Sequence, residues 1–325
     1  MIPYTYKVPE VTMKAVVYER YGYPEVLEIQ EIDRPTVSDR EVLIRVRASC
    51  VNAADWHFLT GTPWVLRLAA GLFKPKRRIL GLDAAGTVEA VGGSVRRFQP
   101  GDEVFATTDD MGGFAEYMCV SEDGTVLMPS NVTHEEAAAV PVAALTALQG
   151  LRDQGRIQAG QKVLINGASG GVGTFAVQIA KWFGAEVTGV CSTKNLNTAC
   201  SIGADHVIDY TMEDFARNGG RYDLILDIVG NLPLADCRRM LTRHGIYVAA
   251  AGGPIRLLWI GITGGQRMVS WVSRPKQQDL VFLKELLEAG VVKPVIDRRY
   301  PFYEIPDALR YVGEGHARGK VVITM

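Results

Sequence analysis

The chain has 325 residues, a formal net charge of −1 and 47% apolar residues, which is the balance of an ordinary globular protein long enough for two domains. Its basic clusters, 74–78 and 298–299, are short, so we expect a solvated loop at the first and no nucleic-acid partner. The five cysteines are odd in number and form no C-x-x-C pair, which argues against a disulfide framework and a zinc knuckle.

The sequence contains neither a membrane-spanning segment nor a secretory signal. No uninterrupted apolar run reaches the roughly 18 residues of a membrane-spanning helix. No basic stretch followed by an apolar stretch opens the chain, as it would in a secretory signal. We therefore expect a cytoplasmic protein with no membrane partner.

The first 130 residues are expected to be rich in β-strands. Short apolar or alternating segments at 13–18, 41–48, 86–91 and 103–106 are separated by glycine and proline turns. Helical periodicity begins only at Thr133, which stands three residues before Glu136 as in a capping box.

A glycine cluster carries the clearest functional signal. A short apolar segment, 162–166, leads into Gly-Ala-Ser-Gly-Gly-Val-Gly at 167–173, and a helix with apolar periodicity follows at 174–181. This order suits a dinucleotide pyrophosphate, because glycines let the backbone approach the phosphates and the helix N-terminus offers N–H groups. The residues expected to face the pyrophosphate are Ser169, Gly170, Gly171 and Val172.

Alternating strands and helices continue after this loop. Strands are expected at 185–191, 206–209, 223–229 and 245–251, with a helix at 196–202. Such alternation predicts right-handed βαβ units in a doubly wound parallel sheet, which makes the fold class α/β. Ligands bind such sheets at the carboxyl ends of the strands, where this chain has Val229, Ala251 and Gly252.

The end of the second strand indicates which dinucleotide is bound. NAD-selecting sites carry a carboxylate there for the ribose 2′-hydroxyl, whereas this chain reads Cys-Ser-Thr-Lys-Asn at 191–195. Ser192 and Lys194 could donate hydrogen bonds to a 2′-phosphate, so the sequence favours NADP(H). The alternative is a solvated turn that happens to contain a lysine.

The tail after residue 274 is expected to contain helices at 277–288 and 305–312 and a last strand at 320–324. The simplest assembly is a β-rich domain formed by 1–130 and 275–325, with a nucleotide-binding domain of 131–274 inserted between its parts.

Together these segments resemble the medium-chain dehydrogenase/reductase superfamily, in its quinone oxidoreductase (zeta-crystallin-like) branch. The resemblance implies a GroES-like catalytic domain, a Rossmann domain, an active site in the cleft between them and a homodimer. The segments that carry it are 48–56, 81–92, 101–104, 112–117, 139–142 with Thr146, 167–173 and 319–322.

The resemblance also bears on whether the protein binds zinc. Zinc-dependent relatives have a catalytic Cys, a His in Gly-His-Glu and a third ligand, and these positions match Asn52, Leu82 and Val142. The four-cysteine structural lobe of those relatives is missing too. Zinc requires three or four N, S or O ligands, so we expect no metal site. Cys50 lacks partners and is expected to be a small buried residue.

Without a metal to polarise a carbonyl, easier hydride acceptors are favoured, namely quinones or the C=C bond of an α,β-unsaturated carbonyl. The resemblance makes Asn52 a contact on the nicotinamide side, with a structural Asx-turn as the alternative, and Asp55 a residue that orients its neighbours. His57, where many relatives have Tyr, is a candidate proton source or a structural histidine. The remaining expected cofactor contacts are Thr146 near the nicotinamide, Tyr210 beside the adenosine and Lys320 at a phosphate or ribose.

The expected function is therefore NADPH-dependent, zinc-independent hydride transfer to a small apolar quinone or enone. Two alternatives stay open: a metal-free alcohol or carbonyl reductase, and a non-catalytic NADPH-binding sensor or interaction protein. The apolar segments 63–78 and 255–262 are expected to wall the substrate pocket, with core or dimer packing as the other interpretation.

Overall fold

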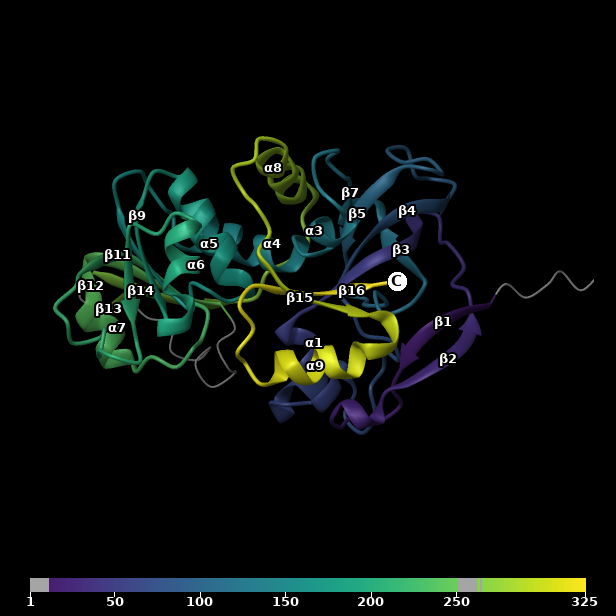
Figure 1. Cartoon of the computed structure of the whole chain (residues 1–325), viewed down its shortest axis with the longest axis horizontal. Helices are drawn as coiled ribbons and strands as arrows, with labels where there is room; N and C mark the ends of the chain where they lie inside the picture. Colours follow the sequence, from purple (N-terminus) through teal and green to yellow (C-terminus); the bar gives the residue numbers. More distant parts are fainter. Residues whose placement is uncertain (1–11, 251–261, 264) are drawn as a thin grey trace, which may run out of the picture.

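The computed structural model describes residues 12–250, 262–263 and 265–325. Two halves lie side by side, each built on its own sheet, with α3 and α4 between them (Figure 1). Ala251, Gly252 and nearly all of the expected pocket segment 255–262 lie outside the described residues. None of the helices in the described ranges has the length and apolar content of a bilayer-spanning segment.

The first half, drawn in teal and green in Figure 1, is a doubly wound sheet in which six strands run parallel. Numbered by their own order along the chain, these six strands stand in the arrangement 3-2-1-4-5-6, which is that of dinucleotide-binding folds. The two-residue β13 pairs antiparallel with β14 at the sheet edge. From one edge to the other, the strands are β10 (His206–Asp209), β9 (Glu186–Cys191), β8 (Lys162–Asn166), β11 (Tyr222–Asp227), β12 (Leu241–Ala250), β14 (Gln266–Trp271) and β13 (Ile262–Thr263).

The expected parallel sheet is confirmed, but it contains one more parallel strand than the sequence predicted. We expected the alternation to end with the strand at 245–251, whereas β14 extends the sheet beyond β12. The sequence of β14, Gln-Arg-Met-Val-Ser-Trp, mixes polar and apolar residues because the strand lies near the sheet edge, so it lacks the apolar run of a central strand. The helices of this half are α5 (Gly171–Trp182), α6 (Leu196–Ser201) and α7 (Leu234–Met240), with a 3₁₀ turn at Thr193–Asn195.

The second half is a mostly antiparallel sheet that the tail of the chain completes. Its strand order is β15-β16-β3-β4-β5-β7, with β6 also paired to β3, and β1 and β2 form a separate hairpin. The tail of the chain thus adds β15 and β16 to this sheet, with β16 paired antiparallel to β3. These strands are β1 (Thr12–Val17), β2 (Glu28–Asp33), β3 (Glu41–Val51), β4 (Asp83–Val91), β5 (Glu103–Thr107), β6 (Tyr117–Ser121), β7 (Thr125–Leu127), β15 (Ile296–Pro301) and β16 (Lys320–Thr324).

Helices fill the junction between the two sheets. The largest apolar cluster contains residues of both, such as Phe105 of the second sheet and Ile165 of the first, joined through fully buried side chains of α4 such as Leu148. The capping box at Thr133 and Glu136 opens α3, as expected. The helices of this half and of the junction are α1 (Ala53–Thr60), α2 (Arg67–Ala70), α3 (His134–Ala138), α4 (Pro141–Gln149), α8 (Gln277–Glu288) and α9 (Ile305–Gly313).

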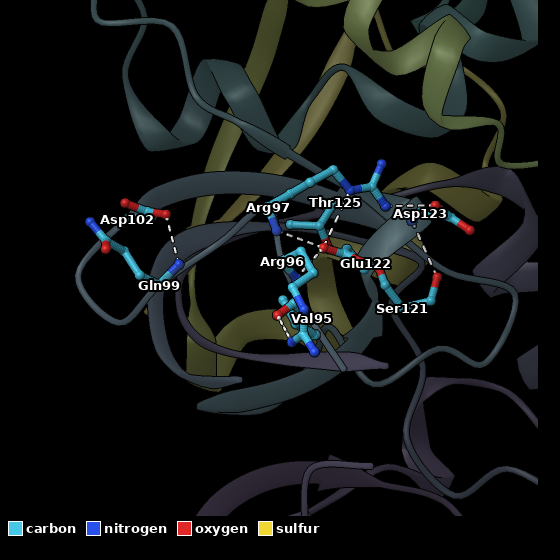
Figure 2. A network of polar contacts seen from close by, with 10 residues as sticks. Val95, Arg96, Arg97, Gln99, Asp102, Ser121, Glu122, Asp123 and Thr125 are labelled. Carbon is cyan, nitrogen blue, oxygen red and sulfur yellow. Dashed lines mark hydrogen bonds and ion pairs between the residues drawn. The ribbon is translucent and has the colours of Figure 1, made fainter. Parts of the chain in front are cut away.

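A polar network holds the outer turns of the second sheet together (Figure 2). Glu122 Oε1 accepts the backbone N–H groups of Arg96 and Arg97 at 2.8 and 2.7 Å, and the Arg97 guanidinium also reaches Asp123 at 2.6 Å. Burial tends to raise the pKa of Glu122, but these N–H donors outweigh it and lower the pKa. These bonds join the turn at Arg96 and Arg97 to the turn at Glu122 and Asp123, about 25 positions further along the chain, so the network fastens two surface turns to each other.

Candidate active site

The glycine loop after β8 forms the tight turn that a dinucleotide requires. Gly167 has a φ of +90°, which favours glycine, and Gly170 N–H donates back to its carbonyl at 3.1 Å. A Cβ on Gly173 would lie 2.0 Å from the Gly167 carbonyl oxygen. Helix α5 begins at Gly171, so its first N–H groups point out of the loop, with Ser169, Gly170, Gly171 and Val172 around them.

A buried carboxylate supports the neighbouring strand end. Asp227, the last residue of β11, accepts bonds from Asn166 Nδ2 at 2.8 Å, from Tyr247 OH at 2.6 Å and from the N–H groups of Val229 and Gly230. A Cβ on Gly167 would lie 2.9 Å from Val229 Cγ2, so Val229 covers the glycine loop. Asp227 was not singled out in the sequence, although an aspartate that ends an apolar strand beside this loop is a usable signal.

The expected 2′-phosphate residues lie together at the end of β9. Ser192 and Lys194 flank the start of a 3₁₀ turn, and Tyr210 N–H donates to the Cys191 carbonyl at 3.2 Å. The structure adds a carboxylate that the sequence analysis did not place there: Asp209 Oδ2, from the end of β10, accepts from Thr193 Oγ1 at 2.5 Å. Bonds from Thr193 and then Thr211 hold the pKa of Asp209 below its usual range, so it stays ionised.

A second group of polar side chains is buried in the other half, where three adjacent strands end together. Asn52 follows β3, Asp83 begins β4 and Lys320 begins β16, and the pairings of β3 with both neighbours bring these ends side by side. Asp55 joins them from the first turn of α1. Asp55 and Asp83 are fully buried and only 3% of Lys320 is exposed.

Hydrogen bonds fix the orientation of the Asn52 amide in this group. Lys320 Nζ donates to Asn52 Oδ1 at 2.6 Å, and Asn52 Nδ2 donates to Asp83 Oδ2 at 2.9 Å. Asn52 Nδ2 also lies 3.5 Å from the Cys50 carbonyl oxygen. Both ends of the amide are thus engaged by protein. Nδ2 carries two N–H donors, and the one that lies 3.5 Å from the Cys50 carbonyl could donate to a substrate oxygen while the Asp83 bond is kept.

The two carboxylates sit in an environment that disfavours their charge. Burial raises the pKa of Asp55 to about 7, while the N–H groups of Asn52 and Gly81, at 2.8 and 3.0 Å, act to lower it. Burial likewise raises the pKa of Asp83 to about 6, and Lys320 is the largest influence that lowers it. Lys320 is therefore the positive charge that keeps this group close to electrical balance.

Lys320 also connects this group to the glycine loop. A Cβ on Gly171 would lie 3.1 Å from Lys320 Cδ, so the lysine stem packs against the N-terminus of α5. On the other side, Asp83 Oδ1 accepts the N–H of Val142 at 3.1 Å, in the first turn of α4. One contiguous set of contacts therefore runs from the glycine loop through Lys320, Asn52 and Asp83 to α4.

Helix α4 carries Thr146, the expected neighbour of the nicotinamide. Its hydroxyl donates to the Val142 carbonyl at 2.7 Å and lies 2.9 Å from Ser273 Oγ, just beyond β14. Ser273 is a polar group at this site that the sequence analysis missed, because the contact spans more than a hundred residues and no motif announces it.

The structure places His57 differently from the other two candidate catalytic residues. Asn52 and Asp55 face the buried group, whereas His57 is exposed on the far side of α1. Its Nδ1 lies 2.8 Å from the Thr62 carbonyl oxygen at the C-terminal end of that helix. A role as proton source therefore requires a substrate that reaches this outer side.

The positions that hold zinc in metal-dependent relatives do not fit that metal here. Asn52 supplies an amide, while Leu82 and Val142 belong to an apolar cluster with Val51 and Phe114. Within the described ranges, no group of three or more His, Cys, Asp or Glu residues is arranged to hold a metal ion. Cys50 is buried, and burial raises the pKa of its thiol to about 12, which disfavours the thiolate that zinc binds.

Comparisons with known proteins agree with this architecture. Residues 38–130 match the alcohol dehydrogenase GroES-like domain family, and residues 202–323 match the zinc-binding dehydrogenase family. The chain is 33% identical to the chloroplast envelope quinone oxidoreductase homolog of Arabidopsis thaliana, over 96% of this chain and 98% of the relative. It is also 33% identical to the NADPH-dependent alkenal/one oxidoreductase of the same plant, over 96% and 79% of the two proteins.

A solved structure shows the same arrangement of both halves. The quinone oxidoreductase from Coxiella burnetii superposes with a TM-score of 0.88 at 29% identity, covering 97% of this chain and all of that one. The glycine loop, the returning tail and these relatives together identify an oxidoreductase that uses a nicotinamide cofactor on a small-molecule substrate. The chain belongs to the medium-chain dehydrogenase/reductase superfamily, in its quinone oxidoreductase (zeta-crystallin-like) branch.

Proposed function

We propose that this enzyme uses NADPH, without zinc, to reduce quinones or the C=C bond of α,β-unsaturated carbonyl compounds. The observation that carries the proposal is the Lys320–Asn52–Asp83 group, in which Asn52, the residue matched to the first zinc ligand of metal-dependent relatives, is bonded to a buried cation and a buried carboxylate. Relatives named as a quinone oxidoreductase homolog and an alkenal/one oxidoreductase support the same substrate classes. The expected homodimer and cytoplasmic location stay predictions.

The reaction places specific demands on the protein. Bound NADPH supplies the hydride, and negative charge then develops on the carbonyl or quinone oxygen of the acceptor. Preorganised donors and cations are what stabilise such an oxygen. Lys320 brings its ammonium beside Asn52 at 2.6 Å, and Thr146 and Ser273 add hydroxyl groups on the α4 side. Asp55 holds Asn52 in place through the backbone and so acts as a positioning residue.

The proposal is tested by following NADPH oxidation against a panel of quinones, enals, enones and simple aldehydes, with and without EDTA. We expect turnover of a quinone or an enone at a rate that the chelator leaves unchanged. Aldehyde reduction that the chelator abolishes would contradict the zinc-free mechanism. Tight NADPH binding without turnover of any acceptor would instead favour the non-catalytic sensor.

The preference for NADPH over NADH is expected to depend on Ser192. The change Ser192→Asp places a carboxylate at the end of β9, where it would repel a 2′-phosphate and accept from a ribose hydroxyl. The preference for NADPH over NADH, measured as the ratio of dissociation constants, is expected to fall by about 10- to 100-fold, which is the loss of one bond to a charged group. Ser201→Asp, on the exposed end of α6, is the matched control. NADPH affinity unaltered in Ser192→Asp would show that this turn does not contact the 2′-phosphate.

A further inference from the structure

Large apolar side chains gather on one exposed stretch of the surface. Trp64, Leu68 and Phe73 are 63%, 61% and 89% exposed, and Val65 and Leu72 lie between them with 38% and 43%. We call these five residues, with Lys74 and Lys76, the apolar–basic surface. Single exposed apolar residues are ordinary, but five within ten positions are a concentration of the kind that marks interaction sites. The segment was expected to wall a substrate pocket, and that expectation stays a prediction beside the exposure of these side chains.

The backbone under this surface is held in place by contacts that do not involve the exposed side chains. Tyr21 OH donates to the Gly71 carbonyl at 2.5 Å, and Lys76 N–H donates to the Ala70 carbonyl at 2.8 Å. Arg67 donates to the Gly61 carbonyl at 3.1 Å and lies over the Tyr21 ring. Polar anchors thus fix the segment and leave its apolar side chains free to contact something else.

The charge of this surface has one sign. Residues 61–80 contain Arg67, Lys74, Lys76, Arg77 and Arg78 and no Asp or Glu. Arg77 pairs with Asp110 and Arg78 with Glu19, whereas Lys74 and Lys76 have no ion-pair partner in the part of the chain that the structure describes. Two exposed lysines without an ion-pair partner in the described residues therefore follow the exposed Phe73 within three positions.

We infer that the apolar–basic surface docks on an anionic lipid bilayer. Trp and Phe side chains enter the boundary between headgroups and acyl chains, and lysines beside them bind lipid phosphates. The surface is too small for a stable protein interface, which needs roughly 20–30 residues a side. A twofold contact between copies of the chain would bring like charges together.

The inference departs from the expectation of no membrane partner, which rested on the lack of a spanning segment and of a secretory signal. A surface contact needs no such segment. The apolar–basic surface follows directly after α1, whose N-terminus holds Asn52 and Asp55, and α1 lies beside α9 on the outer side of its half (Figure 1). A bilayer at this position would contact the segment that follows the C-terminal end of α1, the opposite end from Asn52 and Asp55. Docking does not depend on turnover, so it can be tested separately from the proposed function.

The test is sedimentation of the full chain with vesicles of phosphatidylcholine, with or without phosphatidylglycerol. Binding to the anionic vesicles is expected, and raised salt should weaken it. Lys74→Gln/Lys76→Gln is expected to lower the partition coefficient about 30-fold, since each lysine near such a surface contributes about 1 kcal/mol. Trp64→Ala/Phe73→Ala is expected to lower it by about tenfold or more.

Control variants remove the same number of positive charges or of exposed apolar side chains elsewhere on the surface. Arg47→Gln/Arg243→Gln removes two exposed arginines, and Met212→Ala/Val281→Ala removes two exposed apolar side chains, and both are expected to bind like the wild type. Thermal unfolding checks that every variant is folded. Equal binding to both kinds of vesicle, or unchanged binding by the surface variants, would overturn the inference. A dimer that light scattering detects and that Trp64→Ala/Phe73→Ala dissociates would overturn it too, by assigning the surface to a second copy.

Discussion

Replacing Gly173 by alanine is expected to abolish NADPH binding and to lower the free energy of unfolding by about 3 kcal/mol or more. The added Cβ would meet the Gly167 carbonyl oxygen at 2.0 Å and the Ala168 carbonyl carbon at 2.7 Å. Both are backbone atoms, so no side-chain rotation can relieve the contact. The loop and the start of α5 must separate, and the N–H groups that would hold the pyrophosphate separate with them.

A neighbouring glycine provides the control for this prediction. Gly170 has a φ of −82°, and a Cβ there would have its nearest contact at an ordinary 3.5 Å. Gly170→Ala is therefore expected to unfold near the wild-type temperature, with at most a modest loss of NADPH affinity. The two variants are compared by thermal unfolding and by NADPH fluorescence titration. Wild-type affinity and stability in Gly173→Ala would contradict the packing of the glycine loop described above.

This loop was predictable because its signal is local. Strand, glycine cluster and helix follow one another within about twenty residues, and each has a composition that fits one structure only. The boundaries of α8 coincide with the segment expected from its periodicity, 277–288, and the strand 206–209 was also located from the sequence. Local propensity and tertiary packing agree at these positions, so the sequence alone is sufficient.

The contacts that complete the site could not be predicted in this way. Asp83 reaches Asn52 across 31 positions, Ser273 reaches Thr146 across 127 positions, and Lys320 reaches Asn52 across 268 positions. Asp209 approaches Thr193 only because β10 lies beside β9, and the tip of β9 itself carries no carboxylate. Which polar groups meet depends on strand order and register, and a single sequence does not encode these in any local pattern.

Lys320→Met is expected to lower kcat/KM with the best acceptor by about 100-fold or more, because the cation nearest to the Asn52 amide is removed. Asn52 Oδ1 loses its donor, and Asp83 loses the largest influence that lowers its pKa. Breaking a buried charge pair by removing one partner costs about 3 kcal/mol or more of stability. NADPH affinity is expected to fall as well, since the lysine stem packs against Gly171.

A double variant separates the two consequences. In Lys320→Met/Asp83→Asn the uncompensated carboxylate is gone, so stability is expected to recover by a large part of what Lys320→Met lost. Activity is not expected to recover, because the positive charge beside Asn52 is still missing. Full activity of Lys320→Met would contradict the proposed role. If the double variant recovered activity together with stability, Lys320 would serve only as the structural counterion of Asp83.

The pH dependence of stability gives the same test a second readout. The folded-state pKa of Asp83 is already raised to about 6, above the unfolded value, so the wild type loses stability as the pH rises towards about 6 and no further from this group. Without Lys320 that pKa rises further, and Lys320→Met continues to lose stability above about pH 6. Urea unfolding is therefore expected to show that the loss of unfolding free energy in Lys320→Met, relative to the wild type, grows between about pH 5 and about pH 8. In Lys320→Met/Asp83→Asn the carboxyl at position 83 is absent, so its titration should not make this loss grow. A loss in Lys320→Met that stays constant across this range would mean that Lys320 does not control the charge of Asp83, and the electrostatic coupling proposed between these two buried groups would have to be abandoned.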